Sequence, residues 1–282
     1  MGASEDRGRD GGETRGVRFR AVPSGCYEGA VHGTTSFHCN ICGAPSTVAL
    51  DDLRRDEPSC PSCHSSMRLR GVIAALSQAV HGTSLTLDEF PVRTDLVGLG
   101  MSDWEGYAER LGQVFAYTNT HYDEGTRLDI TAPVPAELAG TCDFVITSDV
   151  LEHVAPPVDR ALANLCRLLA PGGLLVLTVP MWPDGRTVEH FPDLDEYRIV
   201  PLGPSPVLVN RTREGELQCF DDLVFHGGPG ATLEMRVFSL PDLLEGLVRA
   251  GFVDIRPFDR ADPGHGVVWR SPEWPVVARA PG

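Results

Sequence analysis

The sequence lacks both long apolar runs and an apolar N-terminal segment. No stretch of about 18 apolar residues occurs among its 282 residues, so no membrane-spanning helix is expected. The opening residues, MGASEDRGRDGGETRG, are polar and contain no apolar core of a secretory signal. We therefore expect a cytoplasmic protein. Its eight cysteines are then expected as metal ligands or buried thiols rather than as disulfides.

Lysine is absent, and positive charge is scarce. All 24 positive charges are arginine, against 39 Asp and Glu, which gives a formal net charge of −15. Residues 1–80 carry nine arginines and nine acidic residues, so residues 81–282 hold the whole excess. Extended nucleic acids are bound by cations that neutralise phosphates. The charge therefore argues against a DNA or RNA substrate, although a local basic patch stays open, and favours a small neutral or cationic ligand.

Length and composition indicate one large domain with a small module. Hydrophobic residues make up 42% of the chain, enough for a sizeable core without disulfides. We divide the sequence into a disordered or irregular N-terminal tail (1–35), a Cys-rich module (36–66), a linking helix and connection (67–90), and a main domain (91–282). No internal repeat is present, and nothing in the sequence indicates an oligomeric state.

Short apolar runs alternate with helical patterns from about residue 94 onward. Strands that alternate with helices form βαβ units, and such units build a parallel sheet with helices on both faces. We therefore predict an α/β fold with a doubly wound, mostly parallel sheet. The predicted strands are Asp95–Leu99, Val114–Tyr117, Phe144–Ser148, Leu174–Val179 and Val276–Ala278, and the predicted helices are Arg68–Val80, Trp104–Leu111, Val158–Leu169 and Leu240–Ala250.

Four cysteines have the spacing of a zinc ribbon. Cys39-x2-Cys42 is followed after seventeen residues by Cys60-x2-Cys63. Two such pairs supply four thiolates in tetrahedral geometry, which closes the coordination shell of Zn²⁺ and predicts a structural site. Reduced cysteines without metal are the alternative. For the module itself, packing or gripping substrate is favoured over nucleic-acid binding, because acidic residues offset its arginines.

The run TDLVGLGMSDWEGYAERLG combines an apolar strand, Gly98-x-Gly100 and a helical stretch. Glycines at the carboxyl end of a first strand let the backbone approach a ligand closely. A single Gly-x-Gly is a weak signal, so its weight depends on the sequence that follows.

That following segment, Cys142 to Pro180, resembles class I S-adenosylmethionine-dependent methyltransferases. In that family a fourth strand ends in an acidic residue, here Asp149, before Leu-Glu-His and a helix. The helix closes with an R-x-L-x-P-G-G pattern, here Arg167–Gly173, and a fifth strand runs into Val-Pro. The likeness extends from about residue 90 to the C-terminus. It implies a Rossmann-like methyltransferase fold, with the tail and the zinc ribbon outside it.

The resemblance also implies cofactor positions. Gly98 and Gly100 would pass under the amino-acid part of S-adenosylmethionine, and Asp149 would lie near its methyl-donor end. Asn119 would hold the ribose and Asp129 would lie near the adenine. Three positions depart from the family pattern: Leu96 replaces an acidic residue, Ser102 a glycine, and Asn119 an acidic residue. The predicted cofactor-binding residues are Gly98, Gly100, Ser102, Asn119, Asp129 and Asp149.

The segments after the fifth strand are the candidates for substrate contact. Glu189, His190 and His226 are the candidate catalytic residues, because a base of near-neutral pKa removes the acceptor proton as the methyl group is attacked. Each could instead be an ordinary loop residue. Glu234 and Arg236, at strand spacing, could form a structural ion pair or face the substrate.

The sequence therefore predicts methyl transfer from S-adenosylmethionine to an O, N or C centre of a small molecule. A sugar, a nucleoside or a specialised metabolite would serve as acceptor. Two alternatives stay open: an RNA methyltransferase whose zinc module recognises RNA, and a methyltransferase-fold protein that has lost methyl transfer and binds a ligand or runs another reaction.

Overall fold

The computed structural model describes residues 33–122, 125–203, 205–226, 232–269 and 274–282. Most of the predicted tail lies outside these ranges, and strand β1 (Thr34–His38) begins within its last residues. The described chain forms two compact units. The smaller comprises residues 193–233, and the larger comprises residues 33–192 and 234–282. The predicted limits of tail, module, connection and main domain stay predictions.

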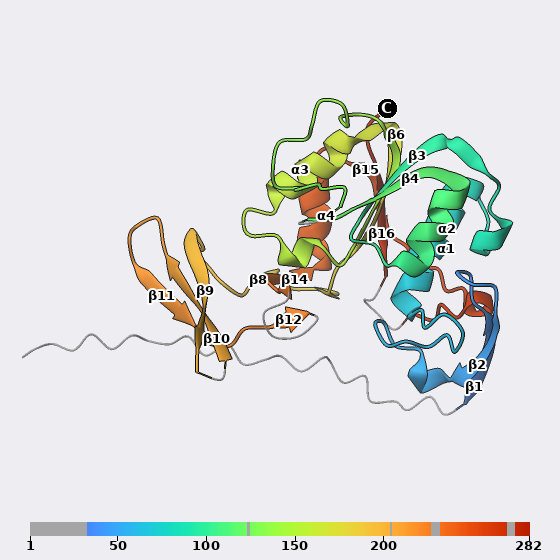
Figure 1. The fold of residues 1–282 in the computed structure, drawn as a ribbon, viewed down its shortest axis with the longest axis horizontal. Coiled ribbons are helices and arrows are strands. Elements are labelled where there is room, and N and C mark those ends of the chain that lie inside the picture. The colour runs from blue at the N-terminus through green and yellow to red at the C-terminus, as the bar shows by residue number, and fades with distance from the viewer. Residues whose placement is uncertain (1–32, 123–124, 204, 227–231, 270–273) are drawn as a thin grey trace, which may run out of the picture. The chain divides into compact units, whose positions relative to one another are not determined.

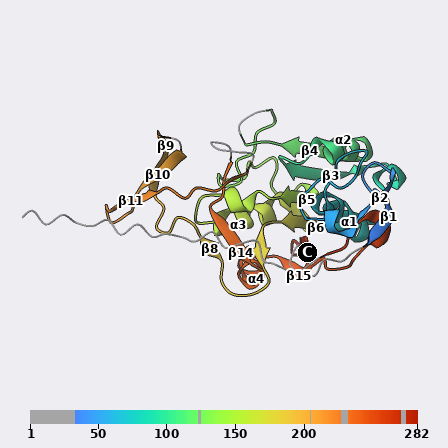
Figure 2. The same ribbon diagram turned by 90° about the horizontal axis from the view of Figure 1, so that it is seen from below.

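A six-stranded sheet forms the centre of the larger unit (Figure 1). Its order is β15-β16-β6-β5-β3-β4, and Figure 2 shows β4, β3, β5 and β6 succeeding one another. Strands β4, β3, β5 and β6 are parallel, whereas β16 and β15 are antiparallel to their neighbours. The strands are β3 (Arg93–Met101), β4 (Phe115–Thr120), β5 (Cys142–Ser148), β6 (Leu169–Thr178), β15 (Val253–Pro257) and β16 (Val276–Arg279).

Helices cover both faces of this sheet, as Figure 1 shows. They are α1 (Met67–His81), α2 (Glu105–Val114), α3 (Asp159–Leu168) and α4 (Leu240–Arg249). Alternate residues of β6 belong to two cores: Leu175 and Leu177 pack with α3 and α4, while Leu174 and Val176 pack with α1 and α2. Both faces of a parallel sheet are buried in this way. The predicted doubly wound α/β fold is confirmed.

The Cys-rich module shares one of these cores. Strands β1 and β2 (Pro45–Ala49) form a hairpin, followed by the short helix η1 (Leu50–Asp52). Phe37, Ile41 and Leu53 are buried in the same cluster as Ile73 of α1. Ser66 caps α1 by accepting the Leu69 N–H bond, which fixes where the module ends and the helix begins. The module is therefore packed onto the main sheet.

The smaller unit contains a three-stranded antiparallel sheet of order β11-β10-β9. Asn210, fully buried, accepts from the Asp195 N–H and donates to the Asp193 carbonyl and to Gln218, which ties the sheet to the chain before it. The strands are β9 (Glu196–Leu202), β10 (Ser205–Arg211), β11 (Leu217–Phe220), β12 (Phe225–His226) and β13 (Thr232–Leu233).

A second small sheet belongs to the larger unit and has the order β7-β14-β8. It places residues on either side of the smaller unit in the sequence next to each other. Its strands are β7 (Met181–Trp182), β8 (Val188–Glu189) and β14 (Arg236–Ser239), and the short helices η2 (Leu87–Glu89), η3 (Leu151–His153) and η4 (Pro263–His265) complete the unit. Within the described ranges, every helix is too short or too polar to cross a membrane.

Candidate functional site

The candidate site lies where the parallel strands end. Strands β3 and β5 are neighbours, yet the chain leaves β3 toward β4 and leaves β5 toward β6, in opposite directions. Such a topological switch point is where open α/β sheets bind ligands, at the carboxyl ends of the strands. Ser102, Asn119 and Asp149 stand at the ends of β3, β4 and β5. The structure therefore brings these three predicted residues to one edge.

The two glycines lie inside β3 rather than in a turn. Gly98 pairs with Phe144, and a Cβ at Gly98 would overlap the Phe144 ring. A Cβ at Gly100 would meet the Tyr117 hydroxyl and the Asp103 carboxylate. The space beside these two glycines is therefore occupied by side chains of this chain. The turn that the sequence placed at Gly-x-Gly comes later, at exposed Ser102, whose φ of 54° is left-handed.

Asn119 binds the backbone of this turn. Its Oδ1 accepts the Asp103 N–H bond at 2.9 Å, while its Nδ2 donates to the Asp103 carbonyl at 2.9 Å and to Glu105 at 3.2 Å. Asp103 is itself buried and accepts a hydrogen bond from Tyr117. Burial raises the pKa of Asp103 to about 7, although the tyrosine bond opposes the shift.

Asp129 lies in the loop beyond β4. Its Oδ1 accepts two bonds from Thr131, one from the backbone N–H at 2.8 Å and one from the hydroxyl at 2.6 Å. Such a bond from a side chain to a backbone two residues on is an Asx turn. Both bonds use the same carboxylate oxygen, and the side chain is half-buried.

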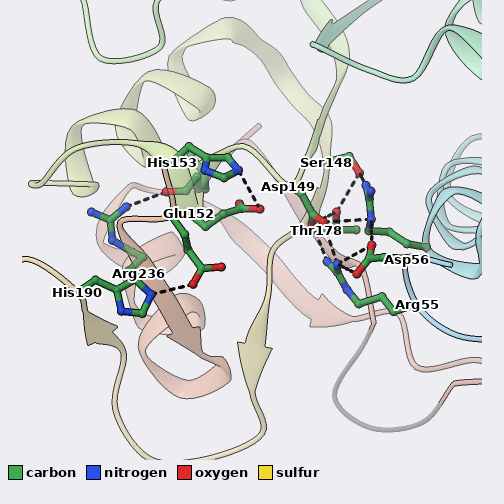
Figure 3. A network of polar contacts seen from close by, with 12 residues as sticks. Arg55, Asp56, Ser148, Asp149, Glu152, His153, Thr178, His190 and Arg236 are labelled. Carbon is green, nitrogen blue, oxygen red and sulfur yellow. Dashed lines mark hydrogen bonds and ion pairs between the residues drawn. The ribbon is translucent and has the colours of Figure 1, made fainter. Parts of the chain in front are cut away.

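Asp149, at the end of β5, is held by an ion network that the sequence did not reveal (Figure 3). Arg55 donates two bonds to its carboxylate, at 2.6 and 2.8 Å. The Arg68 Nε lies 3.1 Å from the same carboxylate, and Thr178 donates to it at 2.9 Å. Arg55 belongs to the Cys-rich module and Arg68 to α1, so the module reaches the edge of the sheet.

The charges of this network decide its protonation. Burial by itself would raise the pKa of Asp149, but the nearby positive charges of Arg55 and Arg68 outweigh it and lower the pKa below its usual range. The Asp149 carboxyl is therefore ionised at neutral pH. The sequence signal for this contact is weak, because Arg55 and Arg68 are only two of the four arginines nearest the cysteines, beside Arg54 and Arg70.

A second polar cluster surrounds η3. His190 Nε2 and Glu234 Oε1 are 2.7 Å apart, and Arg236 donates from Nε to Glu189 at 2.7 Å. Fully buried Arg236 also donates hydrogen bonds to the carbonyls of Leu151 and Val154, so it binds the backbone at both ends of η3. The structure thus brings two predicted residues, Glu189 and His190, together. The proposed Glu234–Arg236 ion pair is replaced by these pairings.

Glu152 lies inside η3, between the two clusters (Figure 3). Its side chain is fully buried, and neither carboxylate oxygen has a hydrogen-bond partner among the described residues, although His153 Nε2 lies 3.7 Å from Oε1. Burial first, and then the charge of Asp149, raise the pKa of Glu152 well above its usual value. In the sequence this residue stands out only as part of the Leu-Glu-His motif. His226, the third catalytic candidate, is half-buried in β12 of the smaller unit.

The four cysteines of the module form one cluster. Their Sγ atoms all lie within 4.8 Å of one another, with Cys39 to Cys63 and Cys42 to Cys60 both at 3.7 Å. A tetrahedron with metal–sulfur bonds of about 2.3 Å has sulfur–sulfur edges of about 3.8 Å, so the donor set fits Zn²⁺. Buried Arg70 donates to Ser59 and Ser65 of the module and supplies positive charge next to the four cysteines.

A comparison with known families decides the domain type. Residues 82–209 match the family model described as a methyltransferase domain. The chain contains a methyltransferase domain. This agrees with the enzyme class that the sequence predicts, a methyltransferase dependent on S-adenosylmethionine. The matched segment spans β3 to β6 and the switch point, so the methyltransferase domain contains the edge at which Ser102, Asn119 and Asp149 lie.

The methyltransferase domain is similar to solved structures at low identity. One is CalS10 from Micromonospora echinaspora, an amino pentose methyltransferase with bound S-adenosylmethionine: 15% identity, 77% of this chain and 92% of that chain, TM-score 0.42. Another is the 1,6-didemethyltoxoflavin-N1-methyltransferase of Burkholderia thailandensis: 18% identity, 76% and 78% coverage, TM-score 0.38. Neither likeness bears on the ligand of this chain.

A curated relative matches a short stretch. It is an uncharacterized 37.1 kDa protein in transposon Tn4556 of Streptomyces fradiae, 46% identical over 59 residues. The stretch is 21% of this chain and 16% of that protein, so the match spans about a sixth of the relative's length.

Proposed function

We propose that this methyltransferase domain transfers a methyl group from S-adenosylmethionine to an O, N or C centre of a small molecule. The observation that carries the proposal is the match of residues 82–209 to a methyltransferase domain. Polar side chains converging at the switch point of a doubly wound sheet support it. The net charge of −15 favours a small acceptor over a polyanion.

The donor chemistry at the strand ends fits the cofactor. Ser102 is exposed at the left-handed turn, Asn119 is half-buried near the end of β4, and Asp129 is half-buried in the loop after β4. Hydroxyl, amide and carboxylate groups suit the hydroxyls and amine of an adenosine. S-adenosylmethionine, when bound, supplies a methyl group on a sulfonium. Ser102, Asn119 and Asp129 would hold it, with Gly98, Gly100 and Asp149 lining the same edge.

The chain's own contribution to the transfer is positioning and proton handling. In-line displacement needs the acceptor held in line and shielded from water rather than a protein nucleophile. The His190–Glu234 pair is the proposed proton acceptor, because a carboxylate 2.7 Å away orients the imidazole. Glu189, fixed by Arg236, would orient the acceptor. His226 stays a candidate from the sequence alone.

We further propose that Cys39, Cys42, Cys60 and Cys63 hold a structural zinc ion. Four thiolates close the shell and leave no position for substrate. Because Ser59 and Ser65 of the module bind Arg70, and Arg55 binds Asp149, the ion would stabilise the loop that reaches the sheet edge. The metal would therefore support the site without taking part in the reaction.

One observation favours a second candidate function, a ligand-binding protein that has lost methyl transfer. The space next to Gly98 and Gly100 is filled by Phe144, Tyr117 and Asp103, and both polar atoms of the Asn119 amide are bonded within the chain. A pocket altered in this way would bind the cofactor weakly. Cofactor binding distinguishes the two candidates.

The experiment is calorimetry with S-adenosylmethionine and S-adenosylhomocysteine on zinc-replete protein. We expect dissociation constants of about 1–100 μM and one zinc per chain in the same sample. Asp129→Ala should weaken binding at least about fivefold, whereas Asp184→Ala, at an exposed loop position, should leave it unchanged. Folded, zinc-loaded protein that binds neither compound would overturn methyl transfer, and metal-free folded protein would overturn the zinc site.

A further inference from the structure

Two guanidinium groups and two carboxylates meet beside the end of β5. Arg55 and Arg68 both bind Asp149, and both also bind Asp56. The Asp56 Oδ1 accepts from Arg55 at 2.9 Å and from Arg68 at 2.7 Å. The Arg68 N–H donates to the Arg55 carbonyl at 2.9 Å, so the backbones that carry the arginines are joined as well. The two side chains therefore form one fixed cationic unit.

The two carboxylates of this unit are not equivalent. Asp149 is 14% exposed, comes from the sheet and has a further bond from Thr178. Asp56 is 53% exposed, and its carboxylate accepts hydrogen bonds from both arginines. Asp149 balances one of the two positive charges from inside. Asp56, a side chain next to Arg55 in the sequence, balances the second from the solvent side.

We propose that Arg55 and Arg68 form a binding site for one anionic group, a carboxylate or a phosphate, of the small-molecule ligand, and that Asp56 occupies this site until the ligand displaces it. Arginine side chains bind carboxylate and phosphate oxygens through charge-assisted N–H bonds, and Asp56 already accepts such bonds here from Arg55 Nη1 and Arg68 Nε. The Cys-rich module thus supplies part of the ligand site. Only the identity of the ligand rests on the proposed function.

The location suits a ligand rather than a purely structural pair. Arg68 also donates to Ser148, the last residue of β5, at 2.5 Å, so the cations lie at the strand ends of the switch point. Figure 3 shows Arg55, Asp56 and Ser148 gathered around Asp149. The anionic group could belong to the acceptor or be the carboxylate of the cofactor's amino-acid part, since both present the same chemistry.

The test uses acetate and inorganic phosphate as probes, followed by the Nε–Hε NMR signals of the arginine side chains. Asp56→Asn removes the resident anion but keeps the size of the side chain. We expect acetate to shift the Arg55 and Arg68 signals at concentrations about tenfold lower in this variant, because an intramolecular competitor is gone. Glu57→Gln removes the same charge from the neighbouring exposed residue and should have little effect.

Arg68→Gln in the Asp56→Asn background should abolish the gain, while Arg54→Gln, an exposed neighbour, should retain it. Zinc content and thermal unfolding show that each variant is folded. Equal anion affinity in Asp56→Asn and Glu57→Gln would overturn the site. Retention of the gain in the Arg68 double variant would overturn it as well.

The two sources are distinguished with S-adenosylhomocysteine and its decarboxylated analogue. If Asp56→Asn increases the affinity for S-adenosylhomocysteine but not for its decarboxylated analogue, the site binds the cofactor's carboxylate. If acetate still shifts Arg68 in the presence of S-adenosylhomocysteine, the site serves the acceptor. Acetate binding by a protein that binds no S-adenosylhomocysteine would support the anion site and contradict the proposed function.

Discussion

Two aspartates at the same edge of the sheet have pKa values shifted in opposite directions. Asp149, after β5, is ionised because Arg55 and Arg68 lie against it. Asp103, after β3, is more deeply buried and has a tyrosine as its hydrogen-bond donor, and burial raises its pKa to about 7. Burial acts to raise the pKa of both carboxyls. The two arginines reverse this effect at Asp149, and among the described residues no cation is paired with Asp103 to do the same.

Asp103→Asn should have the largest effect, because it removes the cost of ionising a buried carboxyl in the folded state. In the wild type, the raised pKa makes ionisation of Asp103 unfavourable in the folded state, so the free energy of unfolding falls between about pH 4 and pH 7 and levels above that range. An amide cannot ionise. At pH 8 the variant should be more stable by up to about 4 kcal/mol, and below about pH 4 the two proteins should agree. Urea unfolding at several pH values measures this.

The control for that comparison is Asp95→Asn. Asp95 pairs with Arg93 on the surface, where solvent screens the interaction, so its loss should leave the free energy of unfolding nearly unchanged. A pH profile of Asp103→Asn that parallels the wild type would contradict the raised pKa of Asp103.

Arg55→Gln should raise the pKa of Asp149, because it removes one of the two cations that lower it. The change leaves a largely buried carboxylate with Arg68 as its remaining cation and should cost about 3 kcal/mol of unfolding free energy at pH 7. The deficit should shrink below about pH 4, where the carboxyl of the variant takes up a proton. Arg54→Gln, whose side chain is exposed, is the matched control in the same loop. A deficit independent of pH would assign the loss to packing instead.

Thr178→Val should have the smallest effect, because it removes one neutral donor from Asp149 and leaves both cations. We expect a loss of about 1–2 kcal/mol. Thr147→Val is the control: Thr147 is also buried, but its hydroxyl has no hydrogen-bond partner among the described residues, so this change should be neutral or stabilising. Equal losses in thermal and urea unfolding of both variants would show that the Thr178 hydroxyl contributes nothing to Asp149.

The elements of the fold were largely predictable from local patterns. The helix expected at Arg68–Val80 is α1, Met67–His81, and the strand expected at Phe144–Ser148 is β5, Cys142–Ser148. Apolar periodicity survives in these elements because each buries one or both faces in the main cores. The unit at 193–233 was not predicted, since its short strands carry mixed polar and apolar residues without a clear period.

The candidate site was predictable only in part. Motif positions placed Ser102, Asn119 and Asp149 at strand ends, because that depends on where each strand stops. The partners of these side chains could not be predicted from the sequence, because a partner such as Arg55 lies 94 residues away from Asp149 along the chain. The same holds for His190 and Glu234, which are 44 residues apart.

By itself, the sequence determined the alternation of strands and helices in the main sheet, the four-cysteine spacing and the methyltransferase motif, because each depends on spacing along the chain. Only the tertiary structure decided which charges meet. Asp149 and Asp103 are both single aspartates after apolar strands, and nothing local distinguishes them. Packing of the Cys-rich module and of α1 brings one guanidinium group each to Asp149, whereas Asp103 is left with a tyrosine and burial. Electrostatic interactions act through space, so their outcome is fixed by the fold.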